Sequence, residues 1–518
     1  MNMPKGVIAA RRPALSAKKR LLSLLVTDTD ARAVASDYRR NPRWTFHLTA
    51  IASTALATQS IWLCLDQTIF ELKLNLILQT VALVTFGLWS SKAGGSFLNA
   101  PALFLASIYI WHSTFLLGHY FELAPIFEFT GMAFTYGDEF VYKATGLVGL
   151  CMSLSVFGVF VGYWRQGRLH AHQTRRTRLK RQCYSLLGPR ATRVARGLLA
   201  TMLLVLLAYL VTDGSQVFHA EYLDLYTDPS TSTLSLLFYR TQFLWVFVTI
   251  FMVASHCMQS RALRIALLLL LALSVVLAML GSRSMPFICL SAIVVSVDCF
   301  VRRLRLVMLF AFLLTLSAVS YVIDSARGAG LGLNVFNFSA TDRDSIDLLH
   351  FFYQNGMIIR DVMRTMEFSR MDGPVYGQSF LAAAVSVVPK PLLDRVGYRE
   401  PTPPSMWLVE NSPDVPVGHG IGYSLVAEVY YNFGMPGCLL FALFGFAIST
   451  GYFRYIFSGD MFAIVLTLNV SVMLMLHMRN DVASYLRLVV YVAVLLAYLK
   501  WHRRRTFELS RRFAGAIG

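Results

Sequence analysis

The stretch VGHGIGYSLVAEVYYNFGMPGCLLFALFGFAISTGYF (residues 417–453) changes character in its middle. Its first half places glycines around one histidine, His419, with an acidic residue, Glu428, about two helical turns further on. Its second half, from residue 434, is apolar over about twenty residues, which is the length of an α-helix that crosses the hydrocarbon of a bilayer. The stretch therefore predicts polar side chains suited to chemistry at the mouth of a membrane helix.

Apolar segments of this kind recur along the whole chain. Of its 518 residues, 56% are hydrophobic and 15% are charged, whereas a soluble domain averages about 45–50% and 25%. We therefore expect an all-α polytopic membrane protein with about twelve transmembrane helices. The predicted spans are 45–65, 70–90, 101–120, 143–164, 197–213, 235–257, 265–281, 285–301, 306–324, 434–453, 461–478 and 484–500.

The basic residues predict how the chain is threaded. The N-terminal segment 1–43, the connection 165–196 and the tail 501–518 are rich in Lys and Arg, whereas 121–140 and 212–230 are acidic and contain neither. Because short cytoplasmic loops carry the excess of Lys and Arg, both termini are expected in the cytoplasm. This distribution accounts for the net charge of +18 without a nucleic-acid partner, since no basic domain with interleaved aromatic residues accompanies it.

One connection is much longer than the others. Residues 325–433 separate the first nine spans, within 44–324, from the last three, within 434–500. The topology places this loop on the outer, periplasmic side of the membrane. Connections of that length usually carry function, so we expect the site here.

The sequence of the loop predicts local structure. DSIDLLHFFYQNGMIIRDVMRTMEF (344–368) has the apolar rhythm of an amphipathic helix. SFLAAAVSVVPKPLL (379–393) is apolar enough either to re-enter the membrane or to lie on it. PTPPSMW (401–407) is typical of an extended connector, because its prolines disfavour a helix.

Arginines lie on the outer side, where the topology rule disfavours them. Ionisable groups at membrane depth are costly and indicate function by default. Several guanidinium groups at one interface repel each other unless an anion lies among them, and the planar fork of arginine suits a phosphate. These residues are Arg283, Arg327, Arg360, Arg364 and Arg479. For Arg360 and Arg364, which share one helix face, a solvated ion-pair face with nearby acidic residues is the alternative interpretation.

The chain lacks the motifs of soluble phosphate, ester or zinc chemistry, and its seven cysteines show no metal-binding spacing. We therefore expect no metal and no cofactor. For acid–base chemistry on the outer side His419 is the first candidate, because imidazole titrates nearest neutral pH. Its flanking glycines would let a substrate approach closely. The alternatives are a solvated loop histidine and, for Glu428, a structural ion pair with an arginine such as Arg479.

Four segments of the chain resemble the motifs of one family. They are YGQSFLAAAVSVVPKPLLDRVGY (376–398), GHGIGYSLVAEVYYNFG (418–434), GSRSMPF (281–287) and MRND (478–481). Together with the large outer loop before the last three helices, they resemble the Wzy-type polymerases of bacterial O-antigens and exopolysaccharides. The chain has Lys390 after Pro389 where the family pattern would have an arginine, which leaves the role of Lys390 open.

The resemblance implies a GT-C-like, metal-independent glycosyltransferase in the bacterial inner membrane, with its active site on the periplasmic side. Such an enzyme would transfer a growing glycan from its undecaprenyl diphosphate carrier to a sugar hydroxyl of the next lipid-linked repeat unit. The implied partners are undecaprenyl-diphosphate-linked oligosaccharide, membrane lipid and a chain-length-regulating membrane protein. The alternatives are an O-antigen ligase, which uses a lipid A–core acceptor, and a transporter or flippase of lipid-linked oligosaccharide.

The resemblance also implies roles for individual residues. His419, with Glu428 as the second candidate, would take the proton of the acceptor hydroxyl. The diphosphate would be held by Arg283, Arg327, Arg360 and Arg479. Other parts of the substrate would be bound by Lys390, Tyr423 and Arg364.

Overall fold

The computed structural model describes residues 43–94, 96–123, 138–170, 188–212, 244–256, 264–265, 267–272, 274, 284–301, 304, 356–388, 390–398, 402–412, 423–458, 460–478 and 480–517. Within these ranges every regular element is a helix. The predicted all-α fold is therefore confirmed for the part of the chain that is described.

Six of the described helices are long and apolar enough to cross a membrane. They are α3 (Arg43–Leu65), α4 (Ile69–Gly94), α7 (Asp138–His170), α8 (Gly188–Thr212), α22 (Leu439–Ser458, whose span begins at Met435) and α24 (Val482–Ile517). A bent pair, α5 (Ala100–His112) and α6 (Thr114–Tyr120), passes the same test as one unit with an angle of 47°. The membrane character that the sequence predicts is thus confirmed.

Shorter apolar helices fall on three other predicted spans. They are α12 (Leu244–His256), α14 (Ser284–Ser296) and α23 (Met461–His477). The predicted span 306–324 lies outside the described residues, and 265–281 is described only in part. The total of twelve spans therefore stays a prediction.

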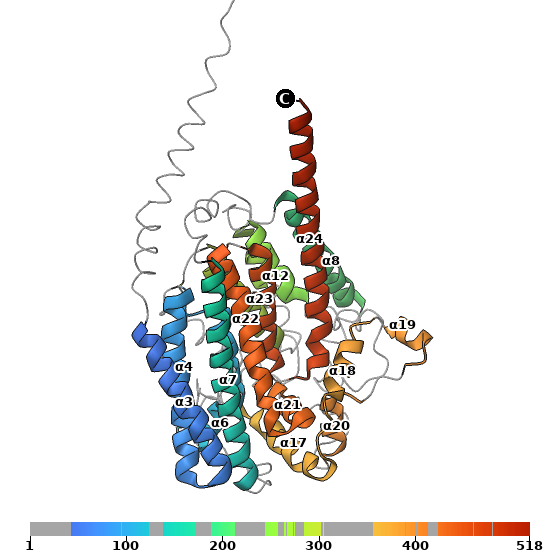
Figure 1. Ribbon diagram of the computed structural model, residues 1–518. Helices are drawn as coiled ribbons and strands as arrows, with labels where there is room; N and C mark the ends of the chain where they lie inside the picture. The colour runs from blue at the N-terminus through green and yellow to red at the C-terminus, as the bar shows by residue number, and fades with distance from the viewer. Residues whose placement is uncertain are drawn as a thin grey trace, which may run out of the picture.

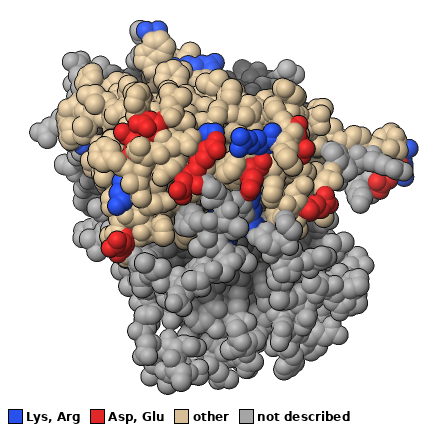
Figure 2. All heavy atoms as spheres, turned by 90° about the horizontal axis from the view of Figure 1, so that it is seen from below, with Lys and Arg blue, Asp and Glu red and all other residues tan. Residues whose placement is uncertain are grey.

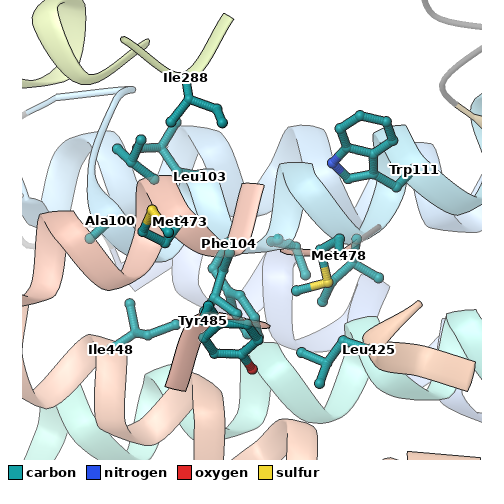
Figure 3. Packing of buried hydrophobic residues seen from close by; sticks show 14 of the residues in the cluster. Ala100, Leu103, Phe104, Trp111, Ile288, Leu425, Ile448, Met473, Met478 and Tyr485 are labelled. Carbon is teal, nitrogen blue, oxygen red and sulfur yellow. The ribbon is translucent and has the colours of Figure 1, made fainter. Parts of the chain in front are cut away.

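The long helices form one bundle. In Figure 1, α3, α4 and α7 make up one side, α22, α23 and α12 the centre, and α24 and α8 the other side. The start of α3 and the end of α24 point toward the same end of the bundle, drawn uppermost. The side chains between the helices form a continuous apolar core. Figure 3 shows part of it, with Phe104 of α5, Ile448 of α22 and Tyr485 of α24 in one cluster.

Small residues bring α7 and α22 into backbone contact. Gly158 and Gly162, four residues apart on α7, face α22, where Gly445 lies. A Cβ atom on Gly158 would lie 2.0 Å from the carbonyl oxygen of Ala442, and one on Gly445 would lie 2.3 Å from that of Ser155. Because lipid supplies no hydrophobic drive for association, membrane helices pair through such close packing of small residues.

The described part of the loop 325–433 folds into short helices in the lower part of the bundle as drawn in Figure 1, away from the end of α24. They are α17 (Ile359–Asp372), α18 (Gln378–Val385), α19 (Lys390–Arg395), α20 (Pro404–Glu410) and α21 (Leu425–Phe433). Helix α17 packs against α21 and α7, and α18 packs against α24 and α21. These contacts seat the loop helices on the bundle.

Two predictions for the loop can be compared with these helices. The amphipathic helix predicted over 344–368 is present from Ile359 and continues to Asp372, while 344–355 lies outside the described residues. The extended connector predicted over 401–407 is wrong, because α20 begins at Pro404. Proline is favoured in the first turn of a helix, where its missing N–H would have had no partner.

Candidate functional site

A seam of buried polar side chains lies where the loop helices meet the bundle. Ionisable groups buried in a membrane protein are costly and usually functional. We call this set the buried polar junction. Each of its side chains is at most 8% exposed, and they are His112, Asp361, Arg364, Thr365, Ser379, Ser424, Glu428, Asn432 and Asp481.

Glu428, on α21, joins three elements of the junction. Its Oε1 accepts a hydrogen bond of 2.6 Å from the hydroxyl of Ser379 on α18. Its Oε2 accepts one of 2.7 Å from the backbone N–H of Val482, the first residue of α24. A carboxylate at the start of a helix satisfies an N–H that has no partner within the helix, and the helix dipole favours it there. Glu428 therefore fastens α21 to both α18 and the beginning of a membrane span.

Asn432, one turn after Glu428, completes the attachment of α18. Its Nδ2 donates to Ser379 Oγ and to the Glu428 carbonyl, each at 2.7 Å. Its Oδ1 accepts from the Ser379 backbone N–H at 3.3 Å. Both the hydroxyl and the N–H of Ser379 are thus bound by one face of α21, so the first turn of α18 has a fixed position.

The environment of Glu428 raises the pKa of its carboxyl toward neutral pH. Burial raises the pKa of Glu428 to about 8, the nearby Asp481 adds to the rise, and the bonds from Ser379 and Val482 oppose it. Asp481 itself accepts a 2.7 Å hydrogen bond from Ser405 of α20. A carboxyl group with such a pKa can give or take a proton near neutrality. With a 1% exposed side chain and both oxygens engaged, it would first have to exchange a partner to touch a substrate.

His112, at the end of α5, holds the start of α21. Its Nδ1 lies 2.8 Å from the Ile108 carbonyl, which can only accept, so Nδ1 is the donor. In the neutral ring Nε2 must then accept, and it receives the Ser424 hydroxyl at 2.6 Å. Ser424 Oγ accepts in turn from the N–H groups of Val426 and Ala427, at 3.1 and 3.3 Å, and so caps α21.

Sequence reasoning did not single out His112, because it lies inside the apolar segment 101–120. A signal was present, since a histidine within a predicted span is itself unusual. Ser379 and Asn432 gave no such signal. Their importance depends on contacts with residues far away in the chain.

Helix α17 brings two of the predicted arginines to this end of the molecule. Arg364 is 3% exposed, and Arg360, four residues earlier on the same face, is partly exposed. Arg364 is therefore not part of a fully solvated ion-pair face. At the far end of α17, Arg370 is exposed, and its guanidinium lies 3.9 Å from Glu139 of α7.

Tyr423 lies near both Thr365 of α17 and Glu428 of α21. It is fully buried, and it directly precedes the capping residue Ser424. Burial raises its pKa well above the usual value for a phenol, the carboxyl of Glu428 raises it further, and the hydroxyl of Thr365 on α17 opposes the rise. Tyr423 is therefore a neutral phenol that α17 and α21 enclose together.

The structure thus buries Arg364 on α17, which packs against α21, and buries Tyr423 and Glu428 at and within α21. Lys390 begins α19, and only its backbone is described. The remaining predicted site residues lie outside the described residues, and they are Arg283, Arg327, His419 and Arg479. Figure 2 looks onto this end of the bundle and shows acidic and basic groups side by side on the described surface, so that surface is not a simple basic patch.

No group of three or more His, Cys, Asp or Glu side chains is placed to hold a metal ion within the described ranges. The fold and the junction together define a class: an all-helical, membrane-embedded protein whose loop helices seal a polar seam at one end of the bundle. Comparisons with protein-family models, with curated proteins and with solved structures found no match to this chain.

Proposed function

We propose that the chain is an integral-membrane glycosyltransferase that polymerises polysaccharide repeat units at the outer face of the bacterial inner membrane. It would transfer the growing glycan from undecaprenyl diphosphate to a sugar hydroxyl of the next lipid-linked unit. The observation that carries this proposal is the burial of Arg364 in α17, which packs against the helix that bears Glu428. The motif resemblance over 376–398 and 418–434 supports the same reaction.

The proposed transfer requires cationic groups that bind the diphosphate and a base that accepts a proton. The bond between the anomeric carbon and the diphosphate oxygen breaks, so negative charge develops on the leaving diphosphate. Guanidinium groups held in place in a poorly hydrated site stabilise such charge. The new bond forms to the acceptor hydroxyl, whose proton must pass to a base. We assign the stabilisation of the leaving diphosphate to Arg360 and Arg364, together with Arg283, Arg327 and Arg479. We assign the acceptance of the hydroxyl proton to His419.

Within this proposal the geometry favours a positioning role for Glu428. The N–H that it holds belongs to Val482, three residues after Arg479 in the chain. Glu428 also follows His419 by nine residues. The carboxyl therefore ties together two segments of the chain that carry proposed site residues, while α18 is fastened by the same side chain.

The test is reconstitution of the purified protein in vesicles with lipid-linked oligosaccharide as the sole substrate. The substrate can be extracted from cells in which the gene for this chain has been deleted. A ladder of lipid-linked polymer, with release of undecaprenyl diphosphate, is the expected result. A ligase would give no ladder until lipid A–core is added, and a transporter would move the oligosaccharide across the vesicle without forming a glycosidic bond. Either of those outcomes would overturn the proposal.

A further inference from the structure

Helix α18 and the turn after it (residues 378–388) carry exposed apolar side chains. Leu381 is 67% exposed and Val388 is 39% exposed, and both lie on the outer face of the segment. The most buried residues of α18 and its C-cap are small, namely Ser379, Ala383 and Ser386, while Phe380 stacks on Phe433 of α21. A surface helix of a soluble protein has the reverse pattern, with its apolar stripe toward the core. Small and polar residues toward the protein are typical of helix contacts inside membranes.

Hydrogen bonds place the end of α18 at membrane depth. Arg487 of α24 donates through Nε to the Ser386 carbonyl, and the Tyr491 hydroxyl donates to the Val387 carbonyl at 2.9 Å. The part of α24 that is apolar enough to span a membrane begins at Tyr485. Tyr491 is six residues further on, which is about 9 Å along a helix axis. The last turn of α18 therefore lies beside the second turn of a membrane span.

The same bonds satisfy the end of α18 without water. The last carbonyls of a helix have no partner within the helix. Here the carbonyls of Ser386 and Val387 are bound by side chains of α24. Irregular backbone is tolerated in hydrocarbon only where protein groups satisfy it. The bonding of Ser386 and Val387 meets that condition.

The outward face of the segment continues the exposed face of α24. On α24, Tyr491, Val494 and Tyr498 are 43%, 63% and 55% exposed. Beyond α18, the exposed Leu392 and Val396 are separated by the exposed Asp394 and Arg395, so α19 has no continuous apolar face. In Figure 1, α18 lies along the lower part of α24, and α19 projects sideways from the bundle. The exposed apolar side chains that lie beside a membrane span are therefore those of α18 and the turn after it, whereas the charges of α19 disfavour hydrocarbon.

We propose that α18 and the turn after it, residues 378–388, form a re-entrant element inserted into the hydrocarbon of the leaflet at this end of the bundle. Its partner is the acyl chains of membrane lipid, which Leu381 and Val388 contact. The sequence alone left open whether the segment re-enters the membrane or lies on it, and the bonds to Arg487 and Tyr491 decide for re-entry. This inference is independent of the proposed enzymatic function.

The test measures depth in the bilayer directly. A fluorescent amino acid excited at longer wavelength than tryptophan is introduced by amber suppression in place of Leu381 or Val388 of the full chain. The protein is reconstituted in vesicles whose lipids carry bromine on the acyl chains, and separately in ordinary vesicles with iodide in the water. Val494, on α24, serves as the lipid-facing reference, and Met371, which is 91% exposed in the last turn of α17, serves as the water-facing one.

Emission from positions 381 and 388 should be quenched by brominated lipid as strongly as emission from position 494, and iodide should have little effect. Quenching by iodide, as at position 371, would show that the segment lies in water. Emission that neither agent quenches would show that another protein segment or a second copy covers it. Both results would overturn the proposal.

A second measurement uses charge. Val388→Lys places a charge on the proposed lipid face, where hydrocarbon cannot solvate it. Its folded yield in membranes should fall severalfold, whereas Met371→Lys should keep the wild-type yield. Equal yields for the two variants would contradict insertion.

Discussion

His112 of α5 and Ser424 at the start of α21 are joined by a hydrogen bond of 2.6 Å between Nε2 and Oγ, although they lie 312 residues apart in the chain. Both side chains are fully buried. The bond links a helix in the first part of the bundle to the helix that presents Glu428. The bond therefore fixes the start of α21 relative to α5.

The first prediction concerns the energetic coupling of this pair. Ser424→Ala removes the cap of α21 and should destabilise the protein by about 0.5–2 kcal/mol. His112→Ala should also destabilise it, in part through the cavity that it leaves. In the double variant the two effects should fall short of their sum by about 1 kcal/mol, because each single change already breaks the shared bond. Reversible unfolding in mixed micelles measures the three free energies.

Ser107 supplies the matched control for this cycle. Its hydroxyl is also buried on α5, but it bonds the Leu103 carbonyl of its own helix at 2.6 Å. Ser107→Ala combined with Ser424→Ala should therefore be additive. If His112 and Ser424 also prove additive, the bond does not couple the two helices.

The second prediction concerns the pH dependence of stability. Burial raises the pKa of Glu428 from 4.5 to about 8. The folded protein then binds this proton more tightly than the unfolded chain does, so stability falls as pH rises wherever only the folded state holds it. The stabilising contribution is complete below about pH 4.5 and is lost as pH rises through about 8. The melting temperature should decline across that window.

Glu428→Gln removes the titration but keeps the shape of the protonated side chain. Its melting temperature should be nearly independent of pH between about 5 and 8, and it should exceed that of the wild type at the alkaline end. Glu410→Gln, at an exposed position on α20, should follow the wild-type curve. Parallel curves for Glu428→Gln and the wild type would show that the Glu428 carboxyl does not titrate in this window.

The third prediction separates the arginines of α17. Arg360→Lys and Arg364→Lys keep the charge but lose the planar fork that binds a phosphate at two points. Polymer formation by reconstituted protein should fall roughly tenfold or more in each variant. Arg370→Lys, on the same helix but exposed, should retain activity. Equal activity in all three variants would mean that this face of α17 does not grip the diphosphate.

The fourth prediction concerns the proposed base. His419→Ala should leave the protein in the membrane with an unchanged melting temperature, while polymer formation falls by about 10²-fold or more. An added imidazole buffer should restore part of the activity if the missing group is a proton acceptor. Wild-type activity in the variant would reject His419 and return the assignment to Glu428.

The sequence carried most of the information about the long helices. The runs that became α3, α4 and α7 could be predicted because the thickness of a bilayer dictates their length. The bend between α5 and α6 could not, since no proline lies at the break near Ser113. The prediction at Pro404 was wrong because it treated proline only as a residue that disfavours helices, whereas proline is also favoured in the first turn of one.

The junction was predictable only in part. Glu428 was recognisable from sequence because an ionisable group near a span is rare, and Arg364 because arginines are disfavoured on the outer side. Ser379 was not, since it is 49 residues from Glu428 and serine is common in every environment. Hydrogen-bond partners of this kind depend on how distant segments meet, and a single sequence does not encode that in any local pattern.

The last prediction tests the close backbone contact between α7 and α22. Gly158→Ala would place a Cβ atom 2.0 Å from the Ala442 carbonyl oxygen, and backbone lies on both sides of the contact. Because α7 and α22 must then move apart, the variant should be destabilised by about 1–3 kcal/mol. Gly167→Ala, on the same helix, meets nothing within 4 Å. It should be neutral or stabilised by up to about 1 kcal/mol, since alanine favours a helix over glycine. Thermal unfolding in detergent distinguishes the two, and similar melting temperatures would show that α7 and α22 do not rely on backbone contact at Gly158.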